Sequence, residues 1–139
     1  MKHLPTIRIK IIPHSSQKYN TCGDFWKTKN GNWEMRISKM NPAYEEAVIE
    51  HELHEMVRTA MDGLNWKDID RFDTVDVFKL DPKNADDPGF SKFAPYHLQH
   101  MEADKIERYV IKKHGKIWKE YVDYLDRMPY KPRKVTVHI

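Results

Sequence analysis

Cysteine is nearly absent from the sequence, since the chain of 139 residues contains a single one, Cys22. One cysteine excludes an intrachain disulfide framework and is typical of a protein that works inside the cell. A nucleophilic role for Cys22 would need an activating base, and no such base stands near it in the sequence. We therefore expect Cys22 to be structural.

Long hydrophobic runs are also missing. No stretch approaches the roughly 18 to 20 apolar residues that a membrane span requires. The first residues, MKHLPTIRIKIIPHSS, carry charges within their apolar part, where the core of a signal peptide is uncharged. The sequence thus predicts a soluble, cytoplasmic protein that has no membrane partner.

Neither sign of charge dominates. Lys and Arg number 24 and Asp and Glu number 21, so the formal net charge is +3. This balance is too even to indicate a nucleic-acid partner, and we expect none. The length and the 40% hydrophobic content fit one domain, residues 1–139, with one modest core. Nothing in the composition predicts an oligomeric state.

Alternating apolar residues predict β-strands at both ends of the chain. Residues 7–12 and 33–38 alternate between apolar and polar side chains, as a half-buried strand does. Between Phe25-Trp26 and Trp33, Asn30-Gly31 is a strong signal for a hairpin with a type I′ turn, in which both central residues have positive φ. Residues 134–139 alternate as well and predict a closing strand. We expect these strands to form a small antiparallel sheet.

The middle of the chain predicts helices. Asn41-Pro42 is a typical helix start, and we expect a helix to about Met61, with a buried stripe formed by Ile49, Leu53, Met56, Val57, Ala60 and Leu64. Two further helices are expected, from Ala94-Pro95 to about residue 114 and around residues 117–125, with a short strand near residues 74–80. The predicted fold class is α+β, a small sheet packed with about three helices.

The sequence EHELHE at residues 50–55 is unusually rich in histidine and glutamate. His51 and Glu55 lie one helical turn apart and can share one ion, with Glu52 beside them, in an H-E-x-x-E pattern. Zinc accepts such a carboxylate in place of a second histidine. Glu50 and His54 form a rival pair on another face, but the apolar residues that flank the motif favour His51 and Glu55. Glutamate-rich helices also produce this pattern by chance.

A second histidine-rich stretch, APYHLQHMEADKIER, could supply a further ligand. His97, His100, Asp104 and Glu107 fall roughly along one face of the predicted helix, and His100 and Asp104 are one turn apart. The alternative interpretation is that these histidines are solvated or pack on tyrosines.

Two blocks of the sequence resemble a known family. HELHEMVRTAMDGLNWKDIDRFD and DDPGFSKFAPYHLQHMEADKIERYV are similar to segments of small phage- and prophage-type proteins that are regarded as zincin-like metallopeptidases. These proteins carry an H-E-x-x-E helix, then an acidic F-D element, then an A-P-Y…H…A…E-R helix. The resemblance covers about residues 47–110, and Glu50 and His54 within the motif depart from it. It implies a metal site on a minimal zincin-like core, in a bacterium or a phage-infected host cell.

The chemistry expected of such a site follows from its ligands. A zinc ion held by His51, Glu55 and His100 would activate a water, and Glu52 would act as general base in the attack on a peptide carbonyl. Asp73 is the competing third ligand. Tyr96 or His97 could donate a hydrogen bond to the oxyanion that forms during the attack. A metal-bound histidine usually donates its other N–H to a further carboxylate, and Asp70 and Asp73 are the candidates for this role.

Two functions are therefore expected as alternatives. The first is a zinc-dependent peptidase that acts on a protein or peptide of unknown sequence. The second is a catalytically inactive phage accessory protein that binds another protein, with or without a structural metal. Both need the same fold, and Glu52 is the residue that only the first requires.

Overall fold

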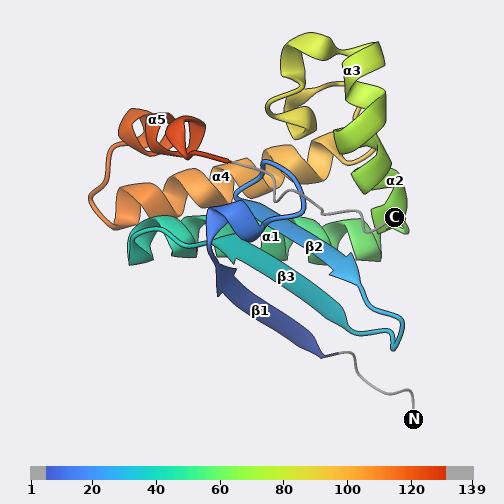
Figure 1. Cartoon of the computed structure of the whole chain (residues 1–139), viewed down its shortest axis with the longest axis horizontal. Helices are drawn as coiled ribbons and strands as arrows, with labels where there is room; N and C mark the ends of the chain where they lie inside the picture. Colours follow the sequence, from blue (N-terminus) through green and yellow to red (C-terminus); the bar gives the residue numbers. More distant parts are fainter. Residues whose placement is uncertain (1–5, 131–139) are drawn as a thin grey trace, which may run out of the picture.

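The computed structural model describes residues 6–130 and shows an α+β fold, which confirms the predicted class (Figure 1). A sheet of three strands, β1 (Ile7–Ile12), β2 (Gly23–Lys27) and β3 (Trp33–Ser38), lies against a layer formed by two long helices, α1 (Pro42–Met61) and α4 (His97–Lys113). The predicted strand at residues 134–139 lies outside the described residues. Within residues 6–130, no helix is long and apolar enough to cross a membrane.

The sheet is mixed, so the prediction of an antiparallel sheet was wrong in one of its two pairings. The strand order is β1-β3-β2, with β2 antiparallel to β3 and β1 parallel to it. Residues 13–22 connect β1 to β2, and β2 does not pair with β1 but lies on the far side of β3. Because β2 runs opposite to both β1 and β3, these two strands run in the same direction. Met35 and Ile37, in the central strand, are completely buried.

The hairpin between β2 and β3 turns where Asn30-Gly31 predicted, but with another geometry. Gly31 has a φ of 82°, whereas Asn30 keeps a negative φ, so the turn is not type I′. Gly31 donates to the carbonyl of Thr28 at 3.0 Å, and Thr28 donates to the carbonyl of Asn32 at 2.7 Å. A type I turn followed by a glycine in the left-handed conformation is the common geometry of a three-residue hairpin loop.

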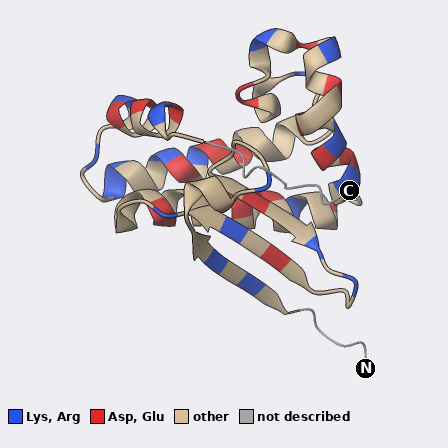
Figure 2. Cartoon of the chain, viewed as in Figure 1, with Lys and Arg blue, Asp and Glu red and all other residues tan. Residues whose placement is uncertain are grey.

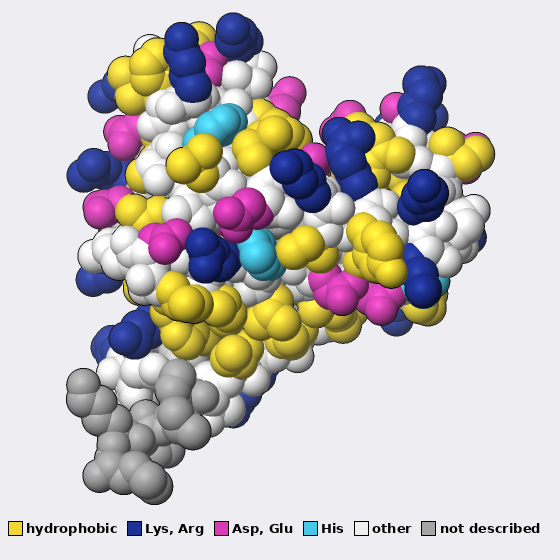
Figure 3. All heavy atoms as spheres, turned by 180° about the vertical axis from the view of Figure 1, so that it is seen from behind, with side chains coloured by type: hydrophobic (Ala, Val, Ile, Leu, Met, Phe, Trp, Pro, Cys, Tyr) yellow, Lys and Arg dark blue, Asp and Glu magenta, His cyan; other side chains and the backbone are white. Residues whose placement is uncertain are grey.

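Strand β1 is largely exposed. Ile7, Ile9 and Ile11 alternate on one face as predicted, yet each is more than 40% exposed. The face of the molecule shown in Figure 3 has a band of hydrophobic side chains near its lower edge. The helices therefore cover β3 and β2 more completely than they cover β1.

Helix α1 begins and ends where the sequence predicts. The Asn41 side chain accepts a hydrogen bond from the Tyr44 amide at 3.0 Å, and Gly63, at a φ of 77°, follows the last turn. The predicted buried stripe is rotated, because Val57 and Ala60 are exposed. The buried face consists of Ala43, Tyr44, Ala47, Val48, His51, Glu55, Met56 and Thr59.

Residues 66–80 are helical throughout, so the short strand expected near residues 74–80 was wrong. Helix α2 (Trp66–Arg71) continues through a wide helical turn (Phe72–Asp76) into α3 (Val77–Leu80). The Asn65 side chain caps α2 by accepting from the Lys67 amide at 2.9 Å. Phe72 and Val77 are buried on one side of this segment, whereas Phe78 and Leu80 are exposed, so one helical face anchors it.

Helix α5 (Trp118–Arg127) follows Gly115, which has a φ of 69°, and agrees with the predicted position. Helix α4 starts three residues after the expected Ala94-Pro95, behind a turn. In Figure 1, α5 and the α2–α3 segment stand on opposite sides above α4. Figure 3 shows, from behind, a notch at the upper edge between two raised parts of the surface.

Candidate metal centre

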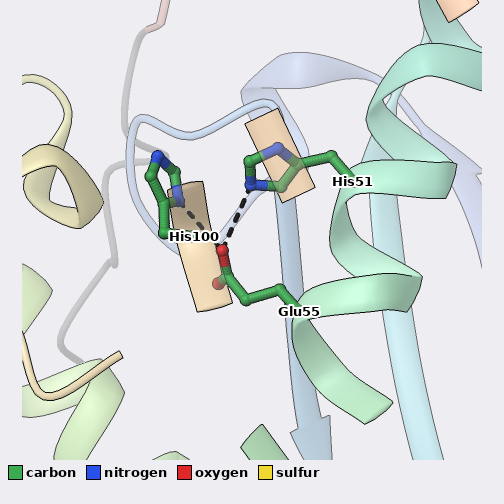
Figure 4. Close-up of side chains that lie close together, drawn as sticks. All are labelled: His51, Glu55 and His100. Atoms are coloured by element: carbon green, nitrogen blue, oxygen red, sulfur yellow. Dashed lines mark hydrogen bonds and ion pairs between the residues drawn. The ribbon is translucent and has the colours of Figure 1, made fainter. Parts of the chain in front are cut away.

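Three side chains with metal-ligating atoms converge at the packed contact between α1 and α4. His51 and Glu55 come from α1 and His100 comes from α4, and their ligand atoms all lie within 4.8 Å of one another (Figure 4). All three residues are buried. Two imidazoles and one carboxylate form a donor set that zinc uses at catalytic sites. This group could hold a metal ion.

The helical turn explains the geometry on α1. His51 and Glu55 are four residues apart and point from the same face, so His51 Nε2 lies 3.1 Å from Glu55 Oε2. His100 reaches the same carboxylate oxygen from α4, with its Nδ1 at 2.9 Å. Because two ring nitrogens approach one oxygen, the three groups already face a common point.

A glycine makes room for His100. A Cβ added to Gly89 would overlap the His100 ring directly, so the chain just before α4 packs its backbone against the imidazole. Phe90 and Tyr96 contact the same ring edge-on, with centroids at 4.9 and 5.9 Å. The orientation of His100 is therefore fixed on several sides.

Each histidine has one ring nitrogen that faces Glu55 and an outer one that does not. A further carboxylate contacts the outer nitrogen of each histidine. Glu107 Oε1 lies 2.6 Å from His51 Nδ1, as a close ion pair that is not aligned as a hydrogen bond. Tyr121 on α5 donates to the other oxygen of Glu107 at 2.5 Å. Asp87 lies 3.3 Å from His100 Nε2. Such contacts orient metal-binding histidines and raise their basicity.

The charges within this group stabilise one another. Burial lowers the pKa of His51, but Glu107 and Glu55 outweigh burial and raise it well above its ordinary value. His100 behaves alike, since Asp87 and Glu55 overcome burial and raise its pKa to about 10. Burial raises the pKa of Glu55, yet the two histidines lower it to about 2. Without a metal ion, protons on the imidazoles balance the carboxylates, and a metal would have to displace them.

Glu52 sits next to this group and takes no part in it. It is half-buried, and its pKa is raised well above the ordinary value, first by burial and then by the charge of Glu55. A Cβ on Gly23 of β2 would lie 2.6 Å from Glu52 Cγ and 2.8 Å from Val48 Cγ1. The strand thus needs glycine where it passes over this part of α1.

The group opens into a cleft of about 1000 Å³. The cleft lies between α5 on one side and the segment of residues 69–89 on the other, with α1 and α4 beneath and residues 19–25 along one wall. His51, Glu52, Glu55 and His100 all line it. The cleft is therefore large enough to hold a molecule much larger than water beside the candidate ligands.

Several residues that the sequence indicated lie elsewhere. His54 contacts Glu102 Oε2 at 3.0 Å on the surface, so the rival pair of Glu50 and His54 does not face the centre. His97 Nδ1 lies 2.9 Å from the Gly89 carbonyl oxygen. Asp104 is buried but accepts from Arg108 Nε at 2.8 Å.

Asp70, Asp73 and Tyr96 line the cleft, and of these three only Tyr96 contacts a histidine, through its edge-on packing with the His100 ring. Tyr96 donates to Asp73 Oδ1 at 2.5 Å. Burial raises the pKa of Asp73 to about 8, in spite of this hydrogen bond. The expectation that Asp70 or Asp73 would support a histidine is not met, because Glu107 and Asp87 occupy those positions.

Sequence reasoning missed the roles of Glu107, Tyr121 and Asp87. Glu107 was detectable in part, since it lies seven residues after His100 on the same predicted helical face. Tyr121 had no local signal, because it reaches Glu107 from another helix. Burial raises the pKa of the Cys22 thiol to about 12, in keeping with a structural cysteine.

Comparisons with family models, with curated proteins and with solved structures give no match. The chemical description of the centre therefore rests on the residues themselves. Its three ligand groups could hold a metal ion, and two further buried atoms, His51 Nδ1 and His100 Nε2, lack an aligned hydrogen-bond partner.

Proposed function

We propose that the protein is a zinc-dependent peptide hydrolase of the zincin-like kind. His51, Glu55 and His100 would hold the ion, and Glu52 would serve as general base. One observation carries this proposal: the buried His-Glu-His group opens into a large cleft, and an uncoordinated glutamate stands beside it. A closed structural zinc site has no use for either feature.

The chemistry that zinc supplies when bound is polarisation of a carbonyl and activation of a water. Glu52 contributes the proton transfer: its carboxylate accepts a proton from the attacking water and returns it to the leaving amine. The raised pKa of Glu52 would fall when a cation is held by the adjacent His51 and Glu55, which makes the carboxylate available as a base.

Glu107 and Tyr121 would position the centre. The Glu107 carboxylate holds the outer nitrogen of His51, which directs Nε2 toward the ion. Tyr96 lines the cleft and is the candidate donor to a developing oxyanion. In this structure its hydroxyl donates to Asp73, so donation to a substrate would require Tyr96 to exchange partners.

A structural metal in a protein-binding module is the second candidate. The network that joins His51, Glu107 and Tyr121 connects α1, α4 and α5, and a metal there would hold these helices together without any catalysis. This function needs His51, Glu55 and His100 but not Glu52.

The test begins with metal content. The purified protein should carry or take up about one zinc ion per chain, His51→Ala should abolish uptake, and His54→Ala should leave it intact. His54 is the matched control because it lies on the same helix and contacts Glu102 instead. Equal loss in both variants would contradict the proposed centre.

The second step separates the two functions. Glu52→Gln keeps size and hydrogen bonding but removes basicity, so it should bind zinc nearly as the wild type does and lose hydrolysis of a broad peptide library. Zinc binding without hydrolysis by the wild type would favour the binding module. Unchanged hydrolysis by Glu52→Gln would refute the role of Glu52.

A further inference from the structure

Apart from the two histidines of the candidate centre, the charged side chains among residues 6–130 that line the cleft are all acidic. Nine carboxylates line it: Asp24, Glu52, Glu55, Asp70, Asp73, Asp86, Asp87, Glu107 and Asp126. Among residues 6–130 no Lys or Arg does so. The whole chain nevertheless has a net charge of +3, and its basic residues mark other places, such as β1 and the far end of α4 (Figure 2). The cleft therefore concentrates negative potential in a protein that is basic overall.

Part of this charge is already neutralised by the candidate centre. Glu55, Glu107 and Asp87 contact its two histidines, and Asp73 accepts from Tyr96. Asp24 and Asp70, from β2 and α2, are outside these pairs. They lie close enough for the charge of Asp70 to raise the pKa of Asp24, after burial as the main cause, to about 6.

Asp24 is buried yet incompletely paired. It is only 5% exposed, and its Oδ2 has no hydrogen-bond partner. Lys18 Nζ forms a long ion pair with the same oxygen at 3.8 Å, which is beyond hydrogen-bond distance, so the oxygen still lacks a hydrogen-bond donor. A buried carboxylate oxygen without a donor is costly, and a cationic donor from outside the chain would satisfy it.

The cation that fits is an extended side chain and not a second metal ion. Among the described residues, only His51, Glu55 and His100 bring donor atoms of three residues within 4.8 Å of one another. Ile69 and Phe78 add apolar and aromatic surface to the lining of the same cleft. The methylene stem of a Lys or Arg side chain packs on such surfaces while its charged end pairs with a carboxylate.

We infer that the cleft binds a polypeptide through a Lys or Arg side chain that pairs with Asp24 and Asp70. This inference deepens the proposed peptidase function and rests on it for the idea that the ligand is a peptide. It assigns a substrate class, basic segments of polypeptide, to the site next to the metal centre.

The experiment measures binding separately from hydrolysis. Fluorescent peptides that differ at one position, carrying either Arg or its neutral isostere citrulline, are titrated by anisotropy into the zinc-loaded full chain with Glu52→Gln. The pH is kept above the Asp24 pKa of about 6. The Arg peptide should bind about 10- to 100-fold tighter, the range of one charge-assisted hydrogen bond.

Matched variants show which carboxylates cause the preference for the Arg peptide. Asp24→Asn and Asp70→Asn should each reduce it, whereas Asp68→Asn, an exposed position on α2 outside the cleft, should leave it unchanged. Equal affinity for both peptides, absence of binding, or equal loss in all three variants would overturn the inference. Asp70→Asn keeps the test decisive if Asp24→Asn fails to fold.

Hydrolysis then distinguishes this inference from the proposed function. If the wild type cleaves both peptides equally, the peptidase function stands and the preference for basic residues is refuted. If the Arg peptide binds preferentially and neither peptide is cleaved, the basic-peptide site stands and the peptidase function is refuted.

Discussion

Replacement of Glu107 tests whether the contacts behind the histidines control metal affinity. In Glu107→Gln the side chain keeps its shape, and its amide oxygen can still accept from His51 Nδ1 while its amide group donates to the Tyr121 hydroxyl. The variant therefore loses the charge of the carboxylate but not the bridge between α4 and α5. Glu107→Ala loses both.

The expected magnitude follows from this difference. Carboxylates that support metal-bound histidines contribute roughly 10- to 100-fold to metal affinity, which corresponds to about 1.4 to 2.7 kcal/mol. Glu107→Gln should fall near the lower end of this range, since an uncharged polar contact with His51 Nδ1 remains. Glu107→Ala should reach the upper end, and it should also destabilise the fold, because the buried Tyr121 hydroxyl and the outer nitrogen of His51 both lose their contacts with Glu107, at about 1 to 3 kcal/mol for each group.

The assay is a competition titration of zinc against a chromophoric chelator, with thermal unfolding measured on the same samples. Glu102→Gln is the matched control, because Glu102 lies on the same helix, is exposed and contacts His54 instead of the centre. The reasoning is refuted if Glu107→Gln binds zinc as tightly as Glu102→Gln. It is also refuted if Glu107→Gln abolishes binding as His51→Ala should, since Glu107 would then be a ligand.

Three further predictions address the ligands, the cleft and the glycine beside His100. His100→Ala should lose zinc affinity severely and Asp73→Asn only slightly, and the reverse order in a zinc titration would show that His100 is not a ligand. Asp24→Asn should match the wild type in stability near pH 4 and exceed it by up to about 3 kcal/mol above pH 6. The reason is that folding raises the pKa of the Asp24 carboxyl, so ionisation of this group opposes folding. An equal difference in stability at both pH values would contradict this. Gly89→Ala should cost about 1 to 3 kcal/mol in unfolding free energy and weaken zinc binding by displacing the His100 ring, and an unchanged melting temperature would disprove the close packing.

The sequence predicted α1 well because its boundaries depend on local interactions. Asn41, Pro42 and Gly63 act within one turn of the helix ends, and the spacing of His51 and Glu55 is a property of any helix. The orientation of α1 was less predictable. Apolar periodicity favoured a stripe through Val57, whereas the buried face also includes His51 and Glu55, which are buried as an ion pair and so carry no hydrophobic signal.

Nonlocal contacts explain most of the remaining differences. The parallel pairing of β1 with β3 depends on the route of residues 13–22, which no short pattern encodes. A short strand was predicted near residues 74–80, but the buried Phe72 and Val77 anchor this part of the chain as a helical segment. Tyr121 reaches Glu107 from a helix that begins well after it, and only the folded chain brings the two together.

The two glycines that pack against the candidate centre and Glu52 can help to identify distant homologues of the protein. Short H-E-x-x-E patterns arise often by chance, so they identify distant relatives poorly. Gly23 and Gly89 are required for a different reason, because any side chain there would collide with Glu52 or His100. Divergent homologues that retain this centre should therefore keep glycine at both positions together with His51, Glu55 and His100. That combination, scattered over most of the chain, is a more discriminating signature than the helix motif alone.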